Sequence, residues 1–120
     1  MTMKTVLLDE LTMPEAEEAA KRGKIIILPV GSVEEHGRHL PLCTDSLQPE
    51  NVAVEVAKKA GCLIAPPIRY GVCTETRSFP GTISVSFDSL HRMVCDVLDE
   101  LVRQGFRQLI VLSGHAGSLQ

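Results

Sequence analysis

The sequence has no tryptophan, one tyrosine and three phenylalanines among its 120 residues. A hydrophobic core without large aromatic side chains has to be built from Val, Ile, Leu and Ala. No apolar run approaches the roughly 20 residues that a membrane span requires. The N-terminal residues Met1–Lys4 lack a signal-peptide hydrophobic region. We therefore expect a cytoplasmic protein without a membrane-spanning segment.

Strong charge of either sign is also missing, because charged residues make up 22% of the chain and the formal net charge is −3. A mildly acidic balance gives no electrostatic reason to expect nucleic acid as a partner. The densest basic cluster, Lys21, Arg22 and Lys24, is better explained as the solvated end of a helix than as a phosphate-binding patch. Length and composition indicate one ordinary domain that covers residues 1–120.

Apolar segments alternate with amphipathic ones along the chain. The apolar, β-branched run from Lys24 to Val30 is typical of a strand buried on both faces. Thr12 and Glu15 form a capping-box pattern at the start of a helix, and Pro49 and Glu50 are expected to open the next one. The complete pattern predicts helices over residues 13–22, 47–60 and 86–104 and strands over residues 24–30, 62–68 and 108–112. This order indicates an α/β layered fold with a mainly parallel sheet and right-handed crossovers.

The segment from Gly31 to Asp45 directly follows the first predicted strand and is dense in possible metal ligands. Glu34, His36 and Asp45 supply carboxylate and imidazole groups, which zinc and manganese accept as ligands. His115 follows the third predicted strand. Because ligands bind beyond the carboxyl ends of the strands in open α/β sheets, we expect these four side chains to converge at one edge of the sheet.

Each of these polar residues also has an ordinary structural explanation. Glu34 could cap a following turn, and Asp45 could be the N-cap of the helix near Leu47. His39 is more easily explained as a packed, hydrogen-bonded histidine than as a ligand, and Glu35 as a surface charge. On spacing alone, the metal site and the structural explanation both stay open.

The four cysteines are Cys43, Cys62, Cys73 and Cys95, and no two of them form a CxxC pair, so a zinc finger or a thioredoxin-like motif is not supported. Cys62 and Cys95 lie in apolar periodic segments and are interpreted as small core residues. Cys43 lies inside the ligand-rich loop and is kept as a weaker ligand candidate. Residues 69–85 form a long irregular connection, which in a compact domain usually has a functional reason.

Residues Pro29–Asp45 have the form P-x-G-S-x-E-x-H-G-x-H-L-P-x-x-x-D. The defining residues are Pro29, Gly31, Ser32, Glu34, His36, Gly37, His39, Leu40, Pro41 and Asp45. Together with the F-P-G-T turn at Phe79–Thr82, this pattern resembles the creatininase, or creatinine amidohydrolase, family. The segment Ser113–Ser118 partly matches the N-G-H-G-G-N loop of that family. The resemblance runs in order along essentially the whole chain.

The resemblance implies a three-layer αβα sandwich and a two-metal hydrolase that cleaves C–N bonds, typically in cyclic or formyl amides. It implies that Glu34 and His115 hold one ion, that His36 holds the other and that Asp45 bridges them. Zn²⁺ or Mn²⁺ are the usual metals, and they would activate a water and polarise the amide carbonyl. Members are typically homohexamers, so a homo-oligomer with a small-molecule amide substrate is expected.

The sequence departs from the family pattern in several respects. Ser113 and Ser118 replace the asparagines of the last loop, and Gly117 stands where some members carry a fifth metal ligand, a glutamate. The chain is about half as long as a family member, so we expect it to represent the N-terminal portion, with an apparently truncated sheet. The general base is unassigned, and Glu35 and His39 are weak candidates.

The sequence is also compatible, to different degrees, with two other functional classes. A half-length chain could be an inactive fragment or a non-catalytic assembly subunit, because an unfinished sheet edge readily recruits another chain. A nucleotide-binding Rossmann domain is disfavoured, because the loop after Val30 has no G-x-G-x-x-G pattern.

Overall fold

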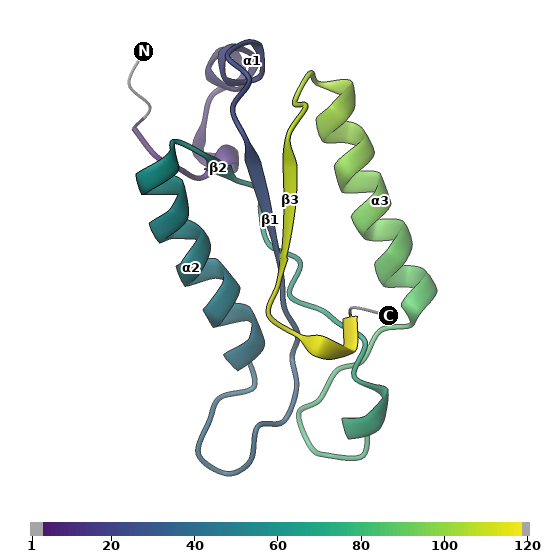
Figure 1. Cartoon of the computed structure of the whole chain (residues 1–120). Coiled ribbons are helices and arrows are strands. Elements are labelled where there is room, and N and C mark those ends of the chain that lie inside the picture. The colour runs from purple at the N-terminus through teal and green to yellow at the C-terminus, as the bar shows by residue number, and fades with distance from the viewer. Residues whose placement is uncertain (1–3, 119–120) are drawn as a thin grey trace.

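The computed structural model describes residues 4–118, which form a three-stranded parallel sheet with helices on both sides (Figure 1). The strands are β1 (Ile26–Val30), β2 (Leu63–Ile64) and β3 (Leu109–Ser113), in the order β2-β1-β3. The helices are α1 (Met13–Lys21), α2 (Thr44–Ala60) and α3 (Phe87–Arg103). Short 3-10 turns cover η1 (Leu8–Glu10), η2 (Thr74–Thr76) and η3 (Ala116–Ser118). The predicted α/β fold with a parallel sheet is confirmed.

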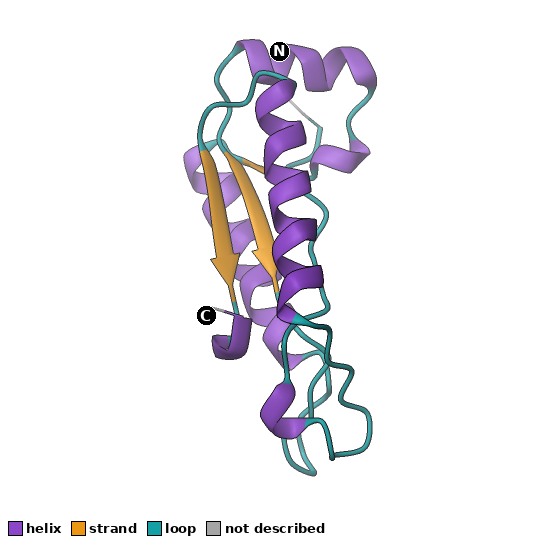
Figure 2. Ribbon diagram, turned by 90° about the vertical axis from the view of Figure 1, so that its right-hand side faces the viewer, coloured by secondary structure: helices purple, strands orange, loops and turns teal. Residues whose placement is uncertain are grey.

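The central strand β1 packs against a different layer on each of its two faces. Successive side chains of a strand point to opposite faces, and every residue of β1 is buried. Leu28 lies in one core with Leu90 and Leu101 of α3. Ile27 lies in a second core with Ala53 of α2. The helices α2 and α3 therefore cover opposite faces of the sheet, which gives the expected αβα layering (Figure 2).

Helices α1 and α3 begin at side-chain caps that the sequence shows. At α1, the backbone N–H of Thr12 donates to Glu15 Oε1 (2.9 Å), which is half of a complete capping box. At α3, Ser86 Oγ accepts from the backbone N–H of Ser89 (3.1 Å). Both helices agree with the predicted ranges to within one residue at each end.

Helix α2 begins earlier than the sequence predicts. It starts at Thr44 with Cys43 at the N-cap position, and Pro49 lies inside it rather than in its first turn. Two backbone N–H groups of the first turn donate to the Cys43 carbonyl oxygen (both 2.9 Å), so helical geometry is established before the proline is reached. Asp45 lies in the first turn, and the alternative that it is the N-cap is therefore wrong.

Strand β2 is much shorter than the predicted strand over residues 62–68. Pro66 and Pro67 have no backbone N–H and cannot donate to the ladder. Beyond them, an isolated bridge joins Ile68 to Val30. The segment therefore follows β1 without forming a continuous strand.

The loops beyond the carboxyl ends of the strands lie together at one end of the molecule (Figure 2). An isolated bridge joins Val33 to Ile83 and so links the loop after β1 to the connection from β2 to α3, and a second bridge, Gly71 to Ser84, lies within that connection. Within residues 4–118, no helix combines the length and the apolar character that crossing a membrane would need.

Candidate metal centre

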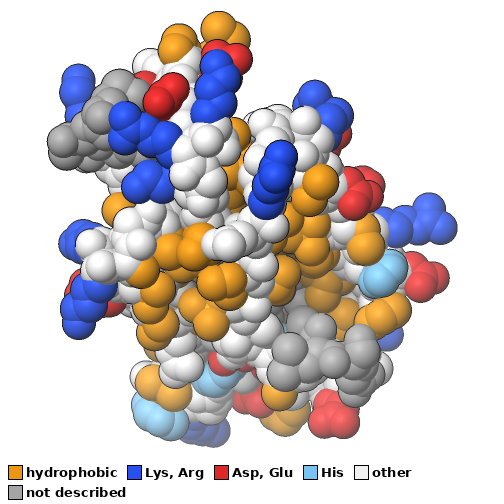
Figure 3. All heavy atoms as spheres, turned by 45° about the horizontal axis from the view of Figure 1, so that its top comes forward, with side chains coloured by type: hydrophobic (Ala, Val, Ile, Leu, Met, Phe, Trp, Pro, Cys, Tyr) orange, Lys and Arg blue, Asp and Glu red, His pale blue; other side chains and the backbone are white. Residues whose placement is uncertain are grey.

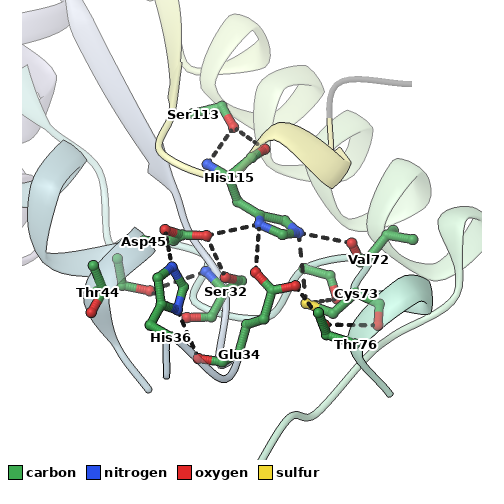
Figure 4. Close-up of polar contacts among 12 residues, drawn as sticks. Ser32, Glu34, His36, Thr44, Asp45, Val72, Cys73, Thr76, Ser113 and His115 are labelled. Atoms are coloured by element: carbon green, nitrogen blue, oxygen red, sulfur yellow. Dashed lines mark hydrogen bonds and ion pairs between the residues drawn. The ribbon is translucent and has the colours of Figure 1, made fainter. Parts of the chain in front are cut away.

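The four residues predicted as metal ligands converge beyond the carboxyl ends of β1 and β3 (Figure 4). His36 Nε2 lies 2.9 Å from Asp45 Oδ1, and His115 Nδ1 lies 2.8 Å from Asp45 Oδ2. His115 Nδ1 also lies 3.3 Å from Glu34 Oε1. Glu34 and His36 come from the loop after β1, Asp45 from the first turn of α2 and His115 from the loop after β3. The expected convergence of the four side chains is present.

Two glycines let the first turn of α2 approach both strand ends. A Cβ atom at Gly31 would clash with Ser46, and one at Gly114 would clash with the Asp45 carbonyl oxygen and with Pro49. The close approach places Asp45 between the loops that follow β1 and β3. Glycine is required at these two positions because the space for a side chain is filled by the helix.

Asp45 is the centre of the polar network. Each of its carboxylate oxygens faces a different imidazole, at 2.9 Å for His36 and 2.8 Å for His115. Ser32 Oγ donates to Oδ2 over 3.2 Å, and Ser32 is completely buried. Asp45 is therefore fixed by contacts on both oxygens, and it presents them in two directions.

Backbone carbonyl groups orient both imidazole rings. His36 Nδ1 lies 2.9 Å from the Glu34 carbonyl oxygen, and His115 Nε2 lies 2.8 Å from the Val72 carbonyl oxygen. A carbonyl oxygen only accepts, so these nitrogens donate when they make the bond. His36 Nε2 and His115 Nδ1 then face the carboxylates as lone-pair donors. Metal-binding histidines usually donate their other N–H to such a partner, and the donor set fits a zinc or manganese site.

The pKa of His36 is raised. The largest cause is the hydrogen bond to the Glu34 carbonyl oxygen; burial acts in the opposite direction, and the charge and hydrogen bond of Asp45 raise it further. Without a metal ion, the site thus favours the protonated form of His36. A cation at the same place would satisfy the same oxygen and nitrogen atoms.

Glu34 does not cap a turn with its side chain. Its Oε1 faces His115, and its Oε2 accepts a hydrogen bond from Thr76 Oγ1 (2.5 Å). Thr76 belongs to η2 in the long connection between β2 and α3, which the sequence marks as functional only by its length. Neither Thr76 nor Ser32 was predicted to position a carboxylate.

The two weak candidates for a general base lie outside the network. Glu35 Oε2 accepts from the backbone N–H of Gly37 (3.0 Å). His39 is exposed and makes no hydrogen bond to the described residues, so the interpretation as a packed, hydrogen-bonded histidine is wrong. Gly37, with φ of 75°, turns the chain outward before His39 is reached. No hydrogen bond links Glu35 or His39 to the four central residues.

The cysteines differ partly from their interpretations. Cys62 is buried as expected, whereas Cys95 is only half-buried. Cys43 belongs to neither of the two potential metal-ligand groups found within residues 4–118, so its role as a ligand has no structural support. One group is Glu34, His36 and Asp45, and the other contains Cys73, which the sequence did not single out. Burial and the nearby Glu34 charge raise the pKa of the Cys73 thiol to about 11.

A cavity of about 800 Å³ opens beside the centre. Glu34, Asp45 and His115 line it together with Val72, Cys73, η2 and the loop after β3. Gly117 forms part of this wall, and a Cβ atom there would clash with the Val72 carbonyl oxygen and approach His115 Nε2 to 2.7 Å. Position 117, where some family members carry a fifth ligand, is therefore closed to a larger side chain in this arrangement.

Comparison with known proteins identifies the family. The family profile "Creatininase: Creatinine amidohydrolase" matches residues 9–120. The chain belongs to the creatininase family. It is 37% identical to the creatinine amidohydrolase of Pseudomonas putida, over 93% of this chain and 45% of that protein. It is 31% identical to the mycofactocin precursor peptide peptidase of Mycolicibacterium smegmatis, over 80% of this chain and 41% of the relative.

Solved creatininase structures have the same fold. The crystal structure of a creatinine amidohydrolase superposes with a TM-score of 0.94 at 35% identity and covers 98% of this chain and 48% of its own. A structure described as "Creatininase Mn" gives 0.94 at 34% identity, over 97% of this chain and 48% of that one. A mutant creatininase of "Zn-Zn type" superposes with a TM-score of 0.91 at 35% sequence identity, over 98% of this chain and 48% of that one. This creatininase-family chain thus spans about half the length of the relatives it matches.

Proposed function

We propose that this creatininase-family chain takes part in metal-dependent hydrolysis of the C–N bond of a cyclic or formyl amide. Its relatives include hydrolases named for creatinine and for a peptide. The observation that carries the proposal is Asp45, whose two oxygens face different imidazole nitrogens at 2.9 and 2.8 Å. A carboxylate presented to two sides is suited to bridge the two ions of a metallohydrolase.

The proposed ligand assignment follows the directions of the side chains. Glu34 and His115 would hold one ion, His36 would hold the other, and Asp45 would offer one oxygen to each. Bound Zn²⁺ or Mn²⁺ would lower the pKa of a water and polarise the substrate carbonyl. The protein itself contributes orientation, because two hydroxyl groups hold the carboxylates and two backbone carbonyls hold the imidazole rings.

The cavity beside the centre is the proposed substrate site. Its volume of about 800 Å³ falls within the usual range for small-molecule sites. The η2 segment forms its outer wall and also supplies the hydroxyl that binds Glu34, so substrate and ligand positions are linked through Thr76. A small-molecule amide is the proposed substrate, and a cytoplasmic location stays a prediction.

Metal analysis and hydrolysis together test the proposal. The purified 120-residue chain is loaded separately with Zn²⁺ and Mn²⁺, dialysed and analysed for bound metal, and then assayed on creatinine, a formyl amide and a short peptide. We expect at least about one equivalent of metal, with loss of binding in Glu34→Ala and Asp45→Ala. Less than about a tenth of an equivalent in the wild-type chain would refute the proposal. Bound metal without hydrolysis of any of the three would refute the activity alone.

A second candidate function is a non-catalytic assembly subunit, and the edge strand β3 favours it. Ile110 and Val111 point to opposite faces of the sheet, yet each is 46% exposed. Figure 3 shows hydrophobic side chains gathered across this side of the molecule. An exposed apolar edge is suited to pair with another chain, including a second copy in a homo-oligomer such as the hexamer that the family resemblance implies. Light scattering tests the assembly function, because a monodisperse monomer would refute assembly through this edge.

A further inference from the structure

A sulfur atom lies on the side of His115 that faces away from Asp45 (Figure 4). Cys73 Sγ is 3.6 Å from His115 Nε2, and the two residues are only 2% and 6% exposed. Glu34 completes the group, because one potential ligand atom from each of Glu34, Cys73 and His115 lies within 4.8 Å of the others. The family signature in the sequence does not include Cys73.

The two ring nitrogens of His115 face different sides, and only one of them at a time can bind a metal ion through its lone pair. A neutral imidazole has one protonated and one unprotonated nitrogen. When Nε2–H donates a hydrogen bond to the Val72 carbonyl oxygen, Nδ1 carries the lone pair that can bind a metal ion, and Nδ1 faces Glu34 and Asp45. When Nδ1–H donates to Asp45 Oδ2, Nε2 carries the lone pair, no longer donates to the Val72 carbonyl oxygen, and faces Cys73. The second case is the carboxylate–histidine–metal arrangement common in zinc proteins.

We propose that Glu34, Cys73 and His115 Nε2 form an alternative, sulfur-containing site for a thiophilic divalent cation such as Zn²⁺. Tetrahedral zinc with Zn–N near 2.0 Å and Zn–S near 2.3 Å separates the two ligand atoms by roughly 3.5 Å, close to the 3.6 Å between Nε2 and Sγ here. On binding, the metal–sulfur bond forms and the thiol proton leaves to solvent. The inference rests on the proposed function in one respect, namely that the cluster binds a divalent cation.

The sulfur atom makes this chain selective between the two expected metals. Thiolate ligands favour zinc, whereas carboxylate-rich sites suit manganese. Zinc is therefore drawn toward Cys73 and manganese toward Asp45, whereas Glu34 belongs to both potential ligand groups. Occupation of the Cys73 side takes His115 away from the oxygen-rich site, because one imidazole donates only one lone pair.

Cobalt binding tests the inference directly, because a Co²⁺–thiolate bond gives an ultraviolet charge-transfer band that oxygen and nitrogen ligands do not give. Co²⁺ is titrated into the metal-free 120-residue chain, and bound cobalt is measured by equilibrium dialysis. The variants are Cys73→Ser, which keeps the size and polarity of the side chain, and Cys43→Ala as a matched control at a half-buried thiol outside both ligand groups. Circular dichroism verifies that each variant is folded.

We expect the band in the wild-type chain and in Cys43→Ala, and its loss in Cys73→Ser. The preference for Zn²⁺ over Mn²⁺, measured by competition dialysis, should fall at least roughly tenfold in Cys73→Ser. Cobalt that binds the wild-type chain without the band, or a band unchanged in Cys73→Ser, overturns this inference and leaves the proposed function standing. A chain that binds no cobalt, zinc or manganese overturns both.

Discussion

Asp45 and His115 lie 70 residues apart in the sequence, and Asp45 Oδ2 is 2.8 Å from His115 Nδ1. The contact joins the first turn of α2 to the loop after β3, with His36 on the opposite oxygen of Asp45. It depends on the parallel pairing of β1 and β3, because that pairing brings the loops that follow both strands to the same end of the sheet. Chain topology therefore assembles the centre, and Asp45 links its two halves.

Replacing Asp45 by asparagine should abolish metal binding with little change in shape. The amide of Asp45→Asn retains one oxygen, so one imidazole faces an NH₂ donor in place of a ligand atom. We expect affinity for Zn²⁺ and Mn²⁺ to fall by at least about a hundredfold, a larger loss than outer partners usually cause. Equilibrium dialysis measures it. Glu35→Gln is the matched control, because its carboxylate accepts from the Gly37 backbone N–H, and equal losses in both variants would contradict the assigned role of Asp45.

The raised pKa of His36 predicts opposite pH dependences for the metal-free and metal-bound protein. Because the folded-state pKa lies above the unfolded value of about 6.5, His36 contributes stability that is fully present below about pH 6.5 and is lost as the pH rises through the folded pKa. Metal binding needs the neutral imidazole, so affinity and any hydrolysis should rise between about pH 5 and 7.5.

The pH dependence of the stability of the metal-free protein is measured by thermal unfolding in the presence of a chelator, from about pH 5 to 8.5. The difference in Tm between the wild-type chain and His36→Gln should be greatest at the acidic end and should shrink as the pH rises. His39→Gln, at an exposed histidine of the same loop, is the matched control variant. A Tm difference for His36→Gln that stays constant with pH would contradict the assignment.

The sequence predicts the layers of this fold better than the start of α2. The run ending at Val30 is apolar at every position, and burial of β1 on both faces follows from that pattern. The start of α2 does not follow from the sequence pattern. Pro49 is a strong local signal for the first turn of a helix, but in the structure the first turn lies earlier and is fixed by backbone hydrogen bonds to the Cys43 carbonyl oxygen. Hydrogen bonds to a backbone carbonyl such as that of Cys43 cannot be predicted from the periodicity of apolar residues.

The same distinction applies to the candidate site. Glu34, His36 and His115 could be grouped from sequence because they follow strands whose parallel arrangement is predictable. Thr76 and Cys73 could not, because they lie in an irregular connection whose path depends on tertiary contacts such as the bridge between the loop after β1 and Ile83. The length of that connection was a sign of function, but it gave no information on which side chains point inward.

Gly117 should be intolerant of a side chain because of its closeness to His115. A Cβ atom at this position would lie 2.7 Å from His115 Nε2 and would also clash with the Val72 carbonyl oxygen. We expect Gly117→Ala to displace the imidazole and to lower metal affinity by roughly tenfold or more, as measured by competition with a chelating dye. Ala116→Ser, at the exposed neighbouring position, is the control. An affinity for Gly117→Ala equal to that of the control would show that the ring does not need this space.

Thr76 should act as a positioning residue through its hydroxyl group alone. Thr76→Val keeps the branched shape and removes the donor to Glu34 Oε2, which lies 2.5 Å from Oγ1. Loss of a hydrogen bond to a charged group costs roughly 1.5–3 kcal/mol, so metal affinity should fall by about ten- to a hundredfold. Thr74→Val, at the exposed first residue of η2, provides the matched control. Isothermal titration with Zn²⁺ gives the affinities, and restoration by Thr76→Ser would identify the hydroxyl as the active group. Equal binding by Thr76→Val and the wild-type chain would mean that Glu34 holds its position without this contact.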